Sequence, residues 1–160
     1  MNEKTILLAE DDVSHVTFFR RALATSGIEC RVDVVRDGAE AIDYLFATGE
    51  HAARDPSHMP DLILLDLKMP RMDGLQVLQV LRRARGAEPV RYPPIVVLTS
   101  SDLESDITDA YRWGAQSYIC KPLAYAEFAA AVRETVQYWL GLNKAAPVNR
   151  IAAHCVGEGL

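Results

Sequence analysis

The chain has 160 residues, 49% of them hydrophobic and 24% charged, which suits one globular domain with a buried core. Its net charge of -5 argues against broad, sequence-independent binding to nucleic acid. The sequence has no apolar run long enough to cross a bilayer and no signal-peptide stretch at its start. Because three scattered cysteines (Cys30, Cys120 and Cys155) form no disulfide framework, we expect a reduced, cytoplasmic protein. From the charge and the lack of a spanning run, we expect no direct binding to nucleic acid or membrane.

Apolar runs alternate with amphipathic stretches along most of the chain. Short apolar runs predict strands at residues 5–9, 31–35, 62–65, 95–98 and 117–120. Apolar side chains at helical spacing predict helices at residues 13–26, 38–48, 74–85, 102–113 and 125–140. Strands that each lead into a helix pair in parallel through right-handed crossovers. The sequence therefore predicts an α/β fold in which a five-stranded parallel sheet carries helices on both faces.

Two segments lack any periodicity. Residues 49–60 contain Pro56 and Pro60 and are predicted to form a loop. Residues 141–160 are predicted to form a C-terminal tail that is flexible or packs at a dimer interface. We therefore expect one domain over residues 1–140, and we expect no DNA-binding domain after it because the tail is too short to form one.

Asp66 is the most informative residue for function. It follows four consecutive apolar residues, 62–65, which are typical of a parallel strand buried on both faces. A turn that contains Pro70 and Gly74 comes directly after it. Asp66 therefore stands where an open α/β sheet places its functional sites. Taken alone, it could equally well be a cap for the next helix.

Other strand ends carry groups that complement Asp66. Glu10 and Asp11 follow the first strand, Thr99 follows the fourth, and Lys121 follows the fifth. Because the carboxyl ends of parallel strands meet at the same edge of a sheet, we expect these side chains to lie together. Neighbouring carboxylates repel one another, and a divalent cation would relieve this repulsion. Oxygen ligands of this kind suit Mg²⁺ better than a soft metal.

The four strand ends carry motifs that resemble the receiver domain of bacterial two-component response regulators. The matching motifs lie at residues 7–12, 65–74, 97–100 and 118–122. The resemblance extends over about residues 5–140. It implies the flavodoxin-like receiver fold with the strand order 2-1-3-4-5.

The resemblance also implies the roles of the acidic residues. Asp66 matches the aspartate that accepts a phosphoryl group from a histidine kinase. Asp11 matches a direct ligand of Mg²⁺, and Glu10 would assist through water. The backbone carbonyl of Lys68 matches a further metal ligand. Asp12 stands at a position where acids are common, and it could also cap the first helix.

The remaining motif residues match a phosphate clamp and a switch. Lys121 would pair with the phosphoryl oxygens, and Thr99 would donate a hydrogen bond to the phosphoryl group. Tyr118 matches the aromatic switch position, whose ring turns inward when the hydroxyl residue is drawn towards the phosphoryl group. In the family the peptide bond that corresponds to Lys121–Pro122 is usually cis, so we expect a cis bond here.

Aromatic residues gather around the fourth helix, fifth strand and fifth helix. The set comprises Tyr111, Trp113, Tyr118, Tyr125, Tyr138 and Trp139. Exposed aromatic side chains mark interfaces. We therefore expect this face to report phosphorylation and to form a homodimer.

Two other functions compete with a phosphate-accepting receiver. Aspartate-based phosphohydrolases of similar fold carry a second Asp two residues after the nucleophile, where this chain has Lys68. A receiver-like docking module that no longer accepts phosphate would not need the full set of Glu10, Asp11, Asp66, Thr99 and Lys121. We therefore expect a stand-alone regulator that catalyses only its own phosphoryl transfer and slow dephosphorylation.

Finer features bear on the partner and on the histidines. The long loop before Asp61 and the aromatic ending at residues 138–140 look like the single-domain regulators that work with bacterial phytochrome kinases. His15, His51 and His58 are interpreted as surface residues and not as ligands or phosphoacceptors.

Overall fold

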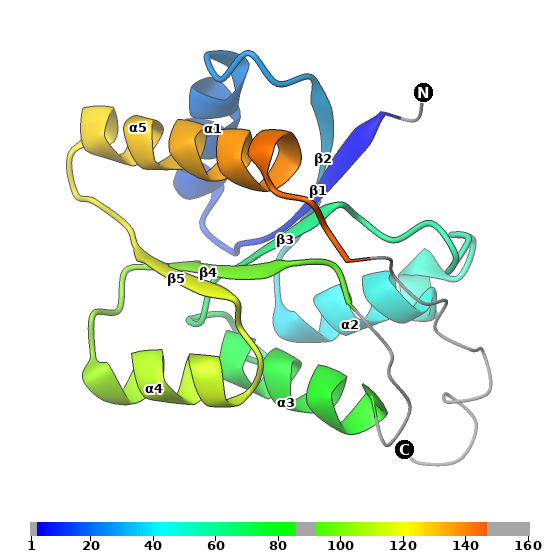
Figure 1. Ribbon diagram of the computed structural model, residues 1–160. Coiled ribbons are helices and arrows are strands. Elements are labelled where there is room, and N and C mark those ends of the chain that lie inside the picture. Colours follow the sequence, from blue (N-terminus) through cyan, green and yellow to red (C-terminus); the bar gives the residue numbers. More distant parts are fainter. Residues whose placement is uncertain (1–2, 86–91, 147–160) are drawn as a thin grey trace.

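The computed structural model describes residues 3–85 and 92–146, and a parallel sheet forms its centre (Figure 1). Its strands are β1 (Lys4–Ala9), β2 (Cys30–Val35), β3 (Leu62–Leu65), β4 (Ile95–Thr99) and β5 (Ser117–Cys120). The order across the sheet is β2-β1-β3-β4-β5, and every neighbouring pair is parallel. The strand order implied by the receiver resemblance is therefore confirmed.

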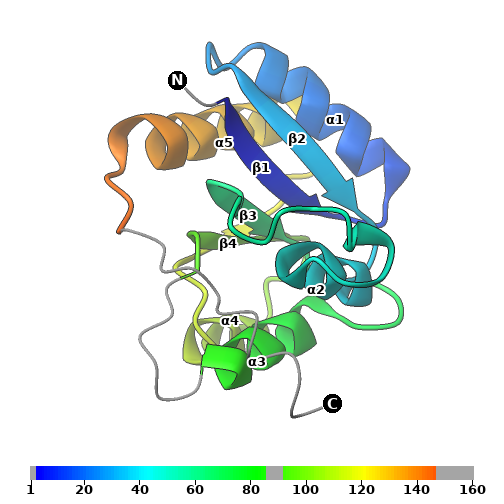
Figure 2. The ribbon, with the colours of Figure 1, turned by 90° about the vertical axis from the view of Figure 1, so that its right-hand side faces the viewer.

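Helices cover both faces of the sheet, as predicted. They are α1 (Val13–Ala24), α2 (Gly38–Phe46), α3 (Gly74–Arg85), α4 (Glu104–Arg112) and α5 (Tyr125–Val136). Helices α1 and α5 lie side by side on one face, and α2, α3 and α4 lie on the other, as Figures 1 and 2 show from two directions.

Each face of the sheet packs against its own hydrophobic core. Successive side chains of a strand point to opposite faces, so Ile6 and Leu8 join the core under α1 and α5. Leu7 and Ala9 join the core under α2, α3 and α4. The same alternation in β3 and β4 explains why their runs are continuously apolar, since both faces of these strands are covered.

Two local features differ from the predictions. The segment 49–60 includes a short 3₁₀ helix, Gly49–His51. The last helix also continues beyond residue 140 as a π-helix, Gln137–Leu142, with Leu140 buried in the core of α1 and α5. Burial of Leu140 holds this last turn against the core. Most of the expected tail, residues 147–160, lies outside the described residues.

Among residues 3–85 and 92–146, no helix combines the length and the apolar character that a membrane span requires.

Candidate functional site

The strand ends that carry the predicted site residues meet at one edge of the sheet. Ala9 of β1 pairs with Leu65 of β3, so the next residues, Glu10 and Asp66, are neighbours. The backbone pairing continues past the strands, because the Asp66 amide donates to the Ala9 carbonyl over 3.0 Å. In the same way the Lys121 amide donates to the Thr99 carbonyl over 2.7 Å. The register thus brings together residues that are more than 100 positions apart in the sequence.

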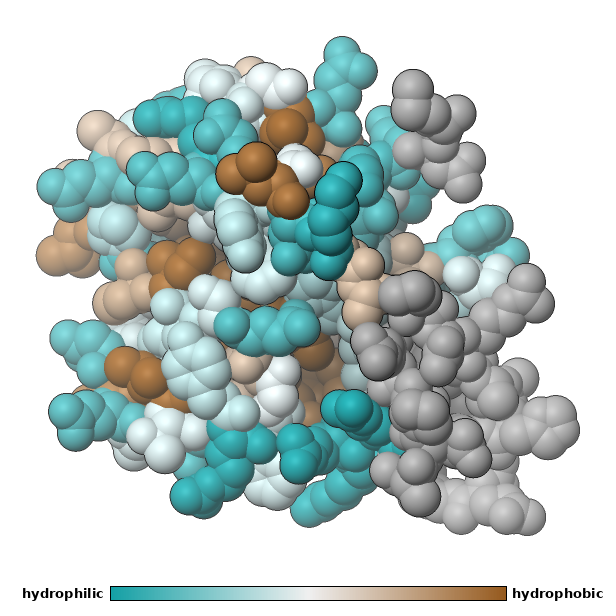
Figure 3. All heavy atoms as spheres, in the orientation of Figure 1, coloured by the Kyte–Doolittle hydropathy of each residue, from teal (hydrophilic) through white to brown (hydrophobic). Residues whose placement is uncertain are grey.

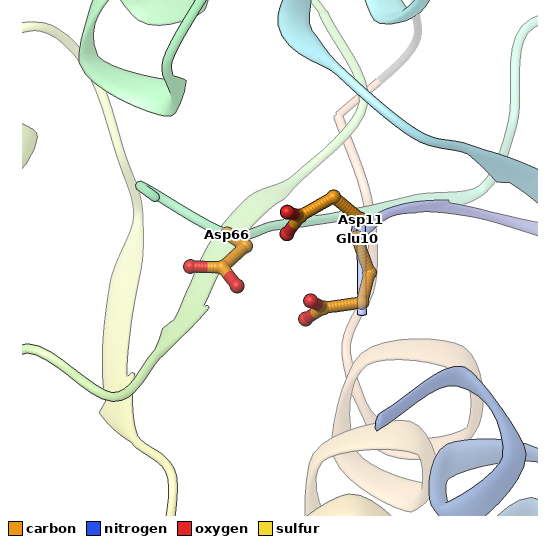
Figure 4. Close-up of side chains that lie close together, drawn as sticks. All are labelled: Glu10, Asp11 and Asp66. Carbon is orange, nitrogen blue, oxygen red and sulfur yellow. The ribbon is translucent and has the colours of Figure 1, made fainter. Parts of the chain in front are cut away.

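Three carboxylates form an acidic cluster at this edge. Ligand oxygens of Glu10, Asp11 and Asp66 all lie within 4.8 Å of one another. Figure 4 shows the side chains of Glu10 and Asp11 on one strand end, with their carboxylates near that of Asp66. Glu10 and Asp66 are buried, whereas Asp11 is exposed. An all-oxygen donor set with one open side fits a divalent cation such as Mg²⁺, which keeps several waters when bound.

Lys121 balances the charge of this cluster. Its Nζ lies 3.0 Å from Asp66 Oδ2 and also donates to Glu10 Oε2. All three side chains are buried, and buried charges are tolerated only when they are paired in this way. The ammonium is therefore held directly beside the carboxylate that the sequence singled out.

Burial also perturbs the acid–base behaviour of Glu10. The pKa of Glu10 is raised to about 7, chiefly by desolvation, and the nearby negative charge of Asp66 acts in the same direction. The hydrogen bond from Lys121 opposes this shift. Without a bound cation, Glu10 thus titrates near neutral pH.

Asp12 has the geometry of a helix cap. Its Oδ1 accepts hydrogen bonds from the backbone amides of Ser14 over 2.8 Å and of His15 over 3.3 Å. These bonds, first of all the one from His15, lower the pKa of Asp12. The predicted capping of the first helix is confirmed, and α1 begins immediately beside the acidic cluster.

His15 belongs to the site although sequence reasoning assigned it to the surface. Its Nδ1 lies 2.9 Å from Lys121 Nζ and 3.7 Å from Glu10 Oε1. The side chain is 38% exposed, so His15 lies partly at the surface as predicted, but it also contacts the site. The signal that could have found His15 is its place three residues after the Asp12 cap, in the turn of α1 that starts at the site.

The loop after β3 is fixed around Asp66. The Lys68 amide donates to Asp66 Oδ1 over 3.1 Å, and a side chain at Gly74 would clash with the Asp66 carbonyl oxygen. Arg71 has a φ of 62°, and its guanidinium donates to Asp37 Oδ2 over 2.8 Å and 2.6 Å. The pair with Asp37, which sequence reasoning missed, ties this loop to the start of α2.

The proposed switch residues are linked through the segment after β4. Thr99 is fully buried at the end of β4. Tyr118 is half-buried, and its hydroxyl donates to the carbonyl of Ser101, two residues after Thr99, over 2.8 Å. The Ser101 hydroxyl bonds in turn to Asp106 of α4 over 2.5 Å. A movement at Thr99 therefore has a short covalent and hydrogen-bonded route to Tyr118 and α4.

The expectation of a cis Lys121–Pro122 bond is wrong, because the described residues contain no cis peptide bond. A trans bond is the cheaper isomer even before proline. It is also sufficient here, since the Lys121 side chain reaches both Asp66 and Glu10 from a trans backbone.

Comparison with known proteins settles the family. A model of the response regulator receiver domain matches residues 6–133. The chain belongs to this family. The predicted resemblance is thereby confirmed, along with the coarse function that it implies.

Relatives of known identity cover most of this receiver. The probable methanogenesis regulatory protein FilR2 of Methanothrix harundinacea is 38% identical over 139 residues, or 87% of this chain and 85% of that protein. Response regulator Rcp1 of Synechocystis is 32% identical over 137 residues, or 86% of this chain and 89% of that protein. Both relatives are thus regulatory proteins by name.

Two solved structures share the fold over nearly their whole length. The phosphorylated cyanobacterial phytochrome response regulator RcpA is 34% identical with a TM-score of 0.78, over 89% of this chain and 98% of that one. The Mn²⁺-bound form of Rcp1 is 30% identical with a TM-score of 0.78, over 90% of this chain and 99% of that one. Phytochrome response regulators are therefore among the proteins that this receiver is similar to.

Proposed function

We propose that this protein is a single-domain response regulator that accepts a phosphoryl group from a histidine kinase onto Asp66. The observation that carries the proposal is the buried Asp66 carboxylate, which lies 3.0 Å from Lys121 Nζ and within 4.8 Å of the other two carboxylates. A carboxylate held between an ammonium and a cation site is arranged for phosphoryl chemistry.

The chemistry follows from this arrangement. An oxygen of Asp66 attacks the phosphorus of the phosphohistidine, the bond from phosphorus to the histidine nitrogen breaks, and an acyl phosphate forms. Lys121 pairs with the phosphoryl oxygens, and the Thr99 hydroxyl donates a hydrogen bond to one of them. Mg²⁺ held by Glu10, Asp11, Asp66 and the Lys68 carbonyl would supply further neutralisation of the phosphoryl charge. Positioning and charge compensation are what this reaction chiefly asks of a protein.

We propose that the signal leaves the site through Thr99, Ser101 and Tyr118. A phosphoryl group that draws the Thr99 hydroxyl inward displaces the segment whose Ser101 carbonyl holds the Tyr118 hydroxyl. The same segment contacts α4 through Asp106. The face formed by α4, β5 and α5 would therefore read the state of Asp66.

The same face is proposed to form a homodimer. Large hydrophobic side chains exposed on or beside its elements are Leu103, Tyr111, Leu123, Tyr125, Tyr138 and Leu142. Figure 3 shows hydrophobic residues on this side in separate patches among hydrophilic ones. Trp113 and Trp139 pack against the two cores, so they contribute less to this surface than the sequence suggested. Sedimentation that shows only monomer, with and without phosphorylation, would contradict the dimer.

The partner is proposed to be a phytochrome-type histidine kinase in the cytoplasm. Support comes from the similarity to RcpA and from the bacteriophytochrome response regulator RtBRR, which is 39% identical with a TM-score of 0.68. The net charge of -5 is in keeping with an output that does not contact nucleic acid directly.

Labelling by a small phosphodonor tests the assignment of Asp66 without requiring the kinase. Purified protein with Mg²⁺ and acetyl phosphate should gain one hydroxylamine-labile phosphoryl group, and Asp66→Asn should abolish the gain, because an amide is no nucleophile. The matched control is Asp73→Asn in the same loop, whose side chain caps the amide of Gln76 and can do so as an amide. The control should be labelled like the wild type. Undiminished labelling of Asp66→Asn would overturn the assignment.

A further inference from the structure

His15 is the one contact of the Lys121 ammonium that carries no formal negative charge. Lys121 Nζ has three N–H donors, and the described residues offer it three partners: Asp66 Oδ2, Glu10 Oε2 and His15 Nδ1 at 2.9 Å. An ammonium can only donate. His15 must therefore accept through a bare Nδ1 and carry its own proton on Nε2, which lies 3.8 Å from Asp12 Oδ2.

The two carboxylate contacts change during the proposed reaction, whereas the imidazole contact does not. Asp66 becomes an acyl phosphate, and a cation held at the site would share the charge of Glu10. Both lose part of their attraction for the ammonium at the moment when the phosphoryl oxygens need it. His15 is neutral in this contact and reaches Lys121 from α1, an element that neither reacts nor binds the cation.

From this geometry we infer that His15 is a positioning residue, which holds the Lys121 ammonium over Asp66 and so speeds phosphoryl transfer. The inference rests on the proposed function of Asp66. His15 does not touch the reacting atoms itself; it acts through Lys121.

A purely structural role for His15 is less consistent with its surroundings. The side chain is 38% exposed, so it is not part of the fully buried core. The start of α1 is already capped by Asp12, whose bonds go to backbone amides and do not depend on the imidazole. Substitution should therefore change the reaction rate and leave the melting temperature nearly unchanged.

Two substitutions of His15 separate the acceptor from the ring. His15→Phe keeps a flat ring and removes the acceptor. His15→Asn removes the ring and places an amide oxygen where Nδ1 stands. With acetyl phosphate and saturating Mg²⁺, His15→Phe should be labelled about fivefold more slowly, the effect of one ordinary hydrogen bond, and His15→Asn within about twofold of the wild type. His58→Phe, an exposed histidine in the loop before β3, is the matched control and should be labelled at the wild-type rate.

Every outcome of this experiment bears on the inference. Equal rates for His15→Phe and the wild type would overturn it and leave the proposed function intact. A loss in His15→Asn but not in His15→Phe would assign the effect to the ring and overturn it as well. An equal loss in both variants would show that an acceptor at this position is not sufficient, which also contradicts the inference. If His15→Phe also needs more Mg²⁺ for half-maximal labelling, by the same factor as its loss of rate, His15 acts through Glu10. This result too would contradict the inference. Absence of labelling in the wild type would contradict the proposed function, and the positioning role with it.

A second readout does not depend on phosphoryl transfer. Nitrogen NMR of the wild-type protein, at a pH where the imidazole is neutral, should show Nδ1 of His15 as the nitrogen without a proton. A proton on Nδ1 would overturn the contact with Lys121 on which the inference stands.

Discussion

The two hydrophobic cores bury apolar side chains, whereas the edge of the sheet where the strands end at their carboxyl side buries polar and charged ones. The cores bury apolar side chains from alternate strand positions, and this burial drives folding. The edge buries Glu10, Asp66, Thr99 and Lys121, which are four of the seven polar or charged residues buried in the described part of the chain. Charges buried at such a site cost free energy that their pairing only partly returns. The cores thus stabilise a fold that tolerates an edge arranged for chemistry.

The largest expected effect on stability comes from the core under α1 and α5. Phe19 is only 1% exposed there, so Phe19→Ala should lower the free energy of unfolding by about 3–5 kcal/mol. Its neighbour Phe18 is 37% exposed, and Phe18→Ala should cost about 1 kcal/mol or less. Urea denaturation of both variants measures the difference. Similar losses for the two would contradict the division between core and surface.

Burial of Glu10 at the edge should make the free energy of unfolding depend on pH. In the absence of divalent cations the pKa of Glu10 lies at about 7 in the folded protein, above its ordinary value of 4.5. Between these two pH values the folded protein holds a proton that the unfolded chain has released. The free energy of unfolding should therefore fall as pH rises through this window, by an amount on the order of 3 kcal/mol.

Glu10→Gln isolates this contribution, because glutamine does not titrate. Urea denaturation in the presence of a chelator, from pH 4.5 to pH 7.5, should show a fall in stability for the wild type that is largely absent in Glu10→Gln. Parallel pH profiles for the two proteins would show that burial at the edge does not perturb Glu10.

A smaller effect is expected where the edge is tied to the rest of the fold. Arg71→Ala removes the pair with Asp37, and it should lower the free energy of unfolding only slightly because the arginine is largely exposed. It should also weaken Mg²⁺ binding, since this pair holds the loop that carries the Lys68 carbonyl; calorimetric titration measures the affinity. Lys4→Ala breaks an exposed pair with Asp61, far from the site, and serves as the control. Equal Mg²⁺ affinity in Arg71→Ala and the control would contradict the role of the loop.

Local patterns in the sequence were sufficient to predict most of the fold. Short apolar runs and helical spacing located all five strands and all five α-helices of the described residues, and α3 begins and ends where predicted. The strand order came from the family motifs and not from the periodicity. The residues of the acidic edge could be predicted equally well from the sequence, because they stand directly at strand ends: Glu10, Asp66, Thr99 and Lys121.

Contacts that depend on tertiary geometry could not be predicted. The contact of His15 with Lys121 joins residues 106 positions apart, and the pair of Arg71 with Asp37 joins residues 34 apart. Neither leaves a local pattern, since each depends on how loops and helix ends are placed by the sheet. The π-helical form of residues 137–142 likewise leaves no pattern in the sequence periodicity.

The central claim is that Asp66 is the residue that becomes phosphorylated, and mapping the phosphoryl group tests it most directly. After treatment with acetyl phosphate and Mg²⁺, borohydride reduces an acyl phosphate to the corresponding alcohol, which marks the aspartate for peptide mass spectrometry. We predict a single marked residue, Asp66. A mark at Asp11 or at Asp73, with Asp66 unmodified, would contradict the account.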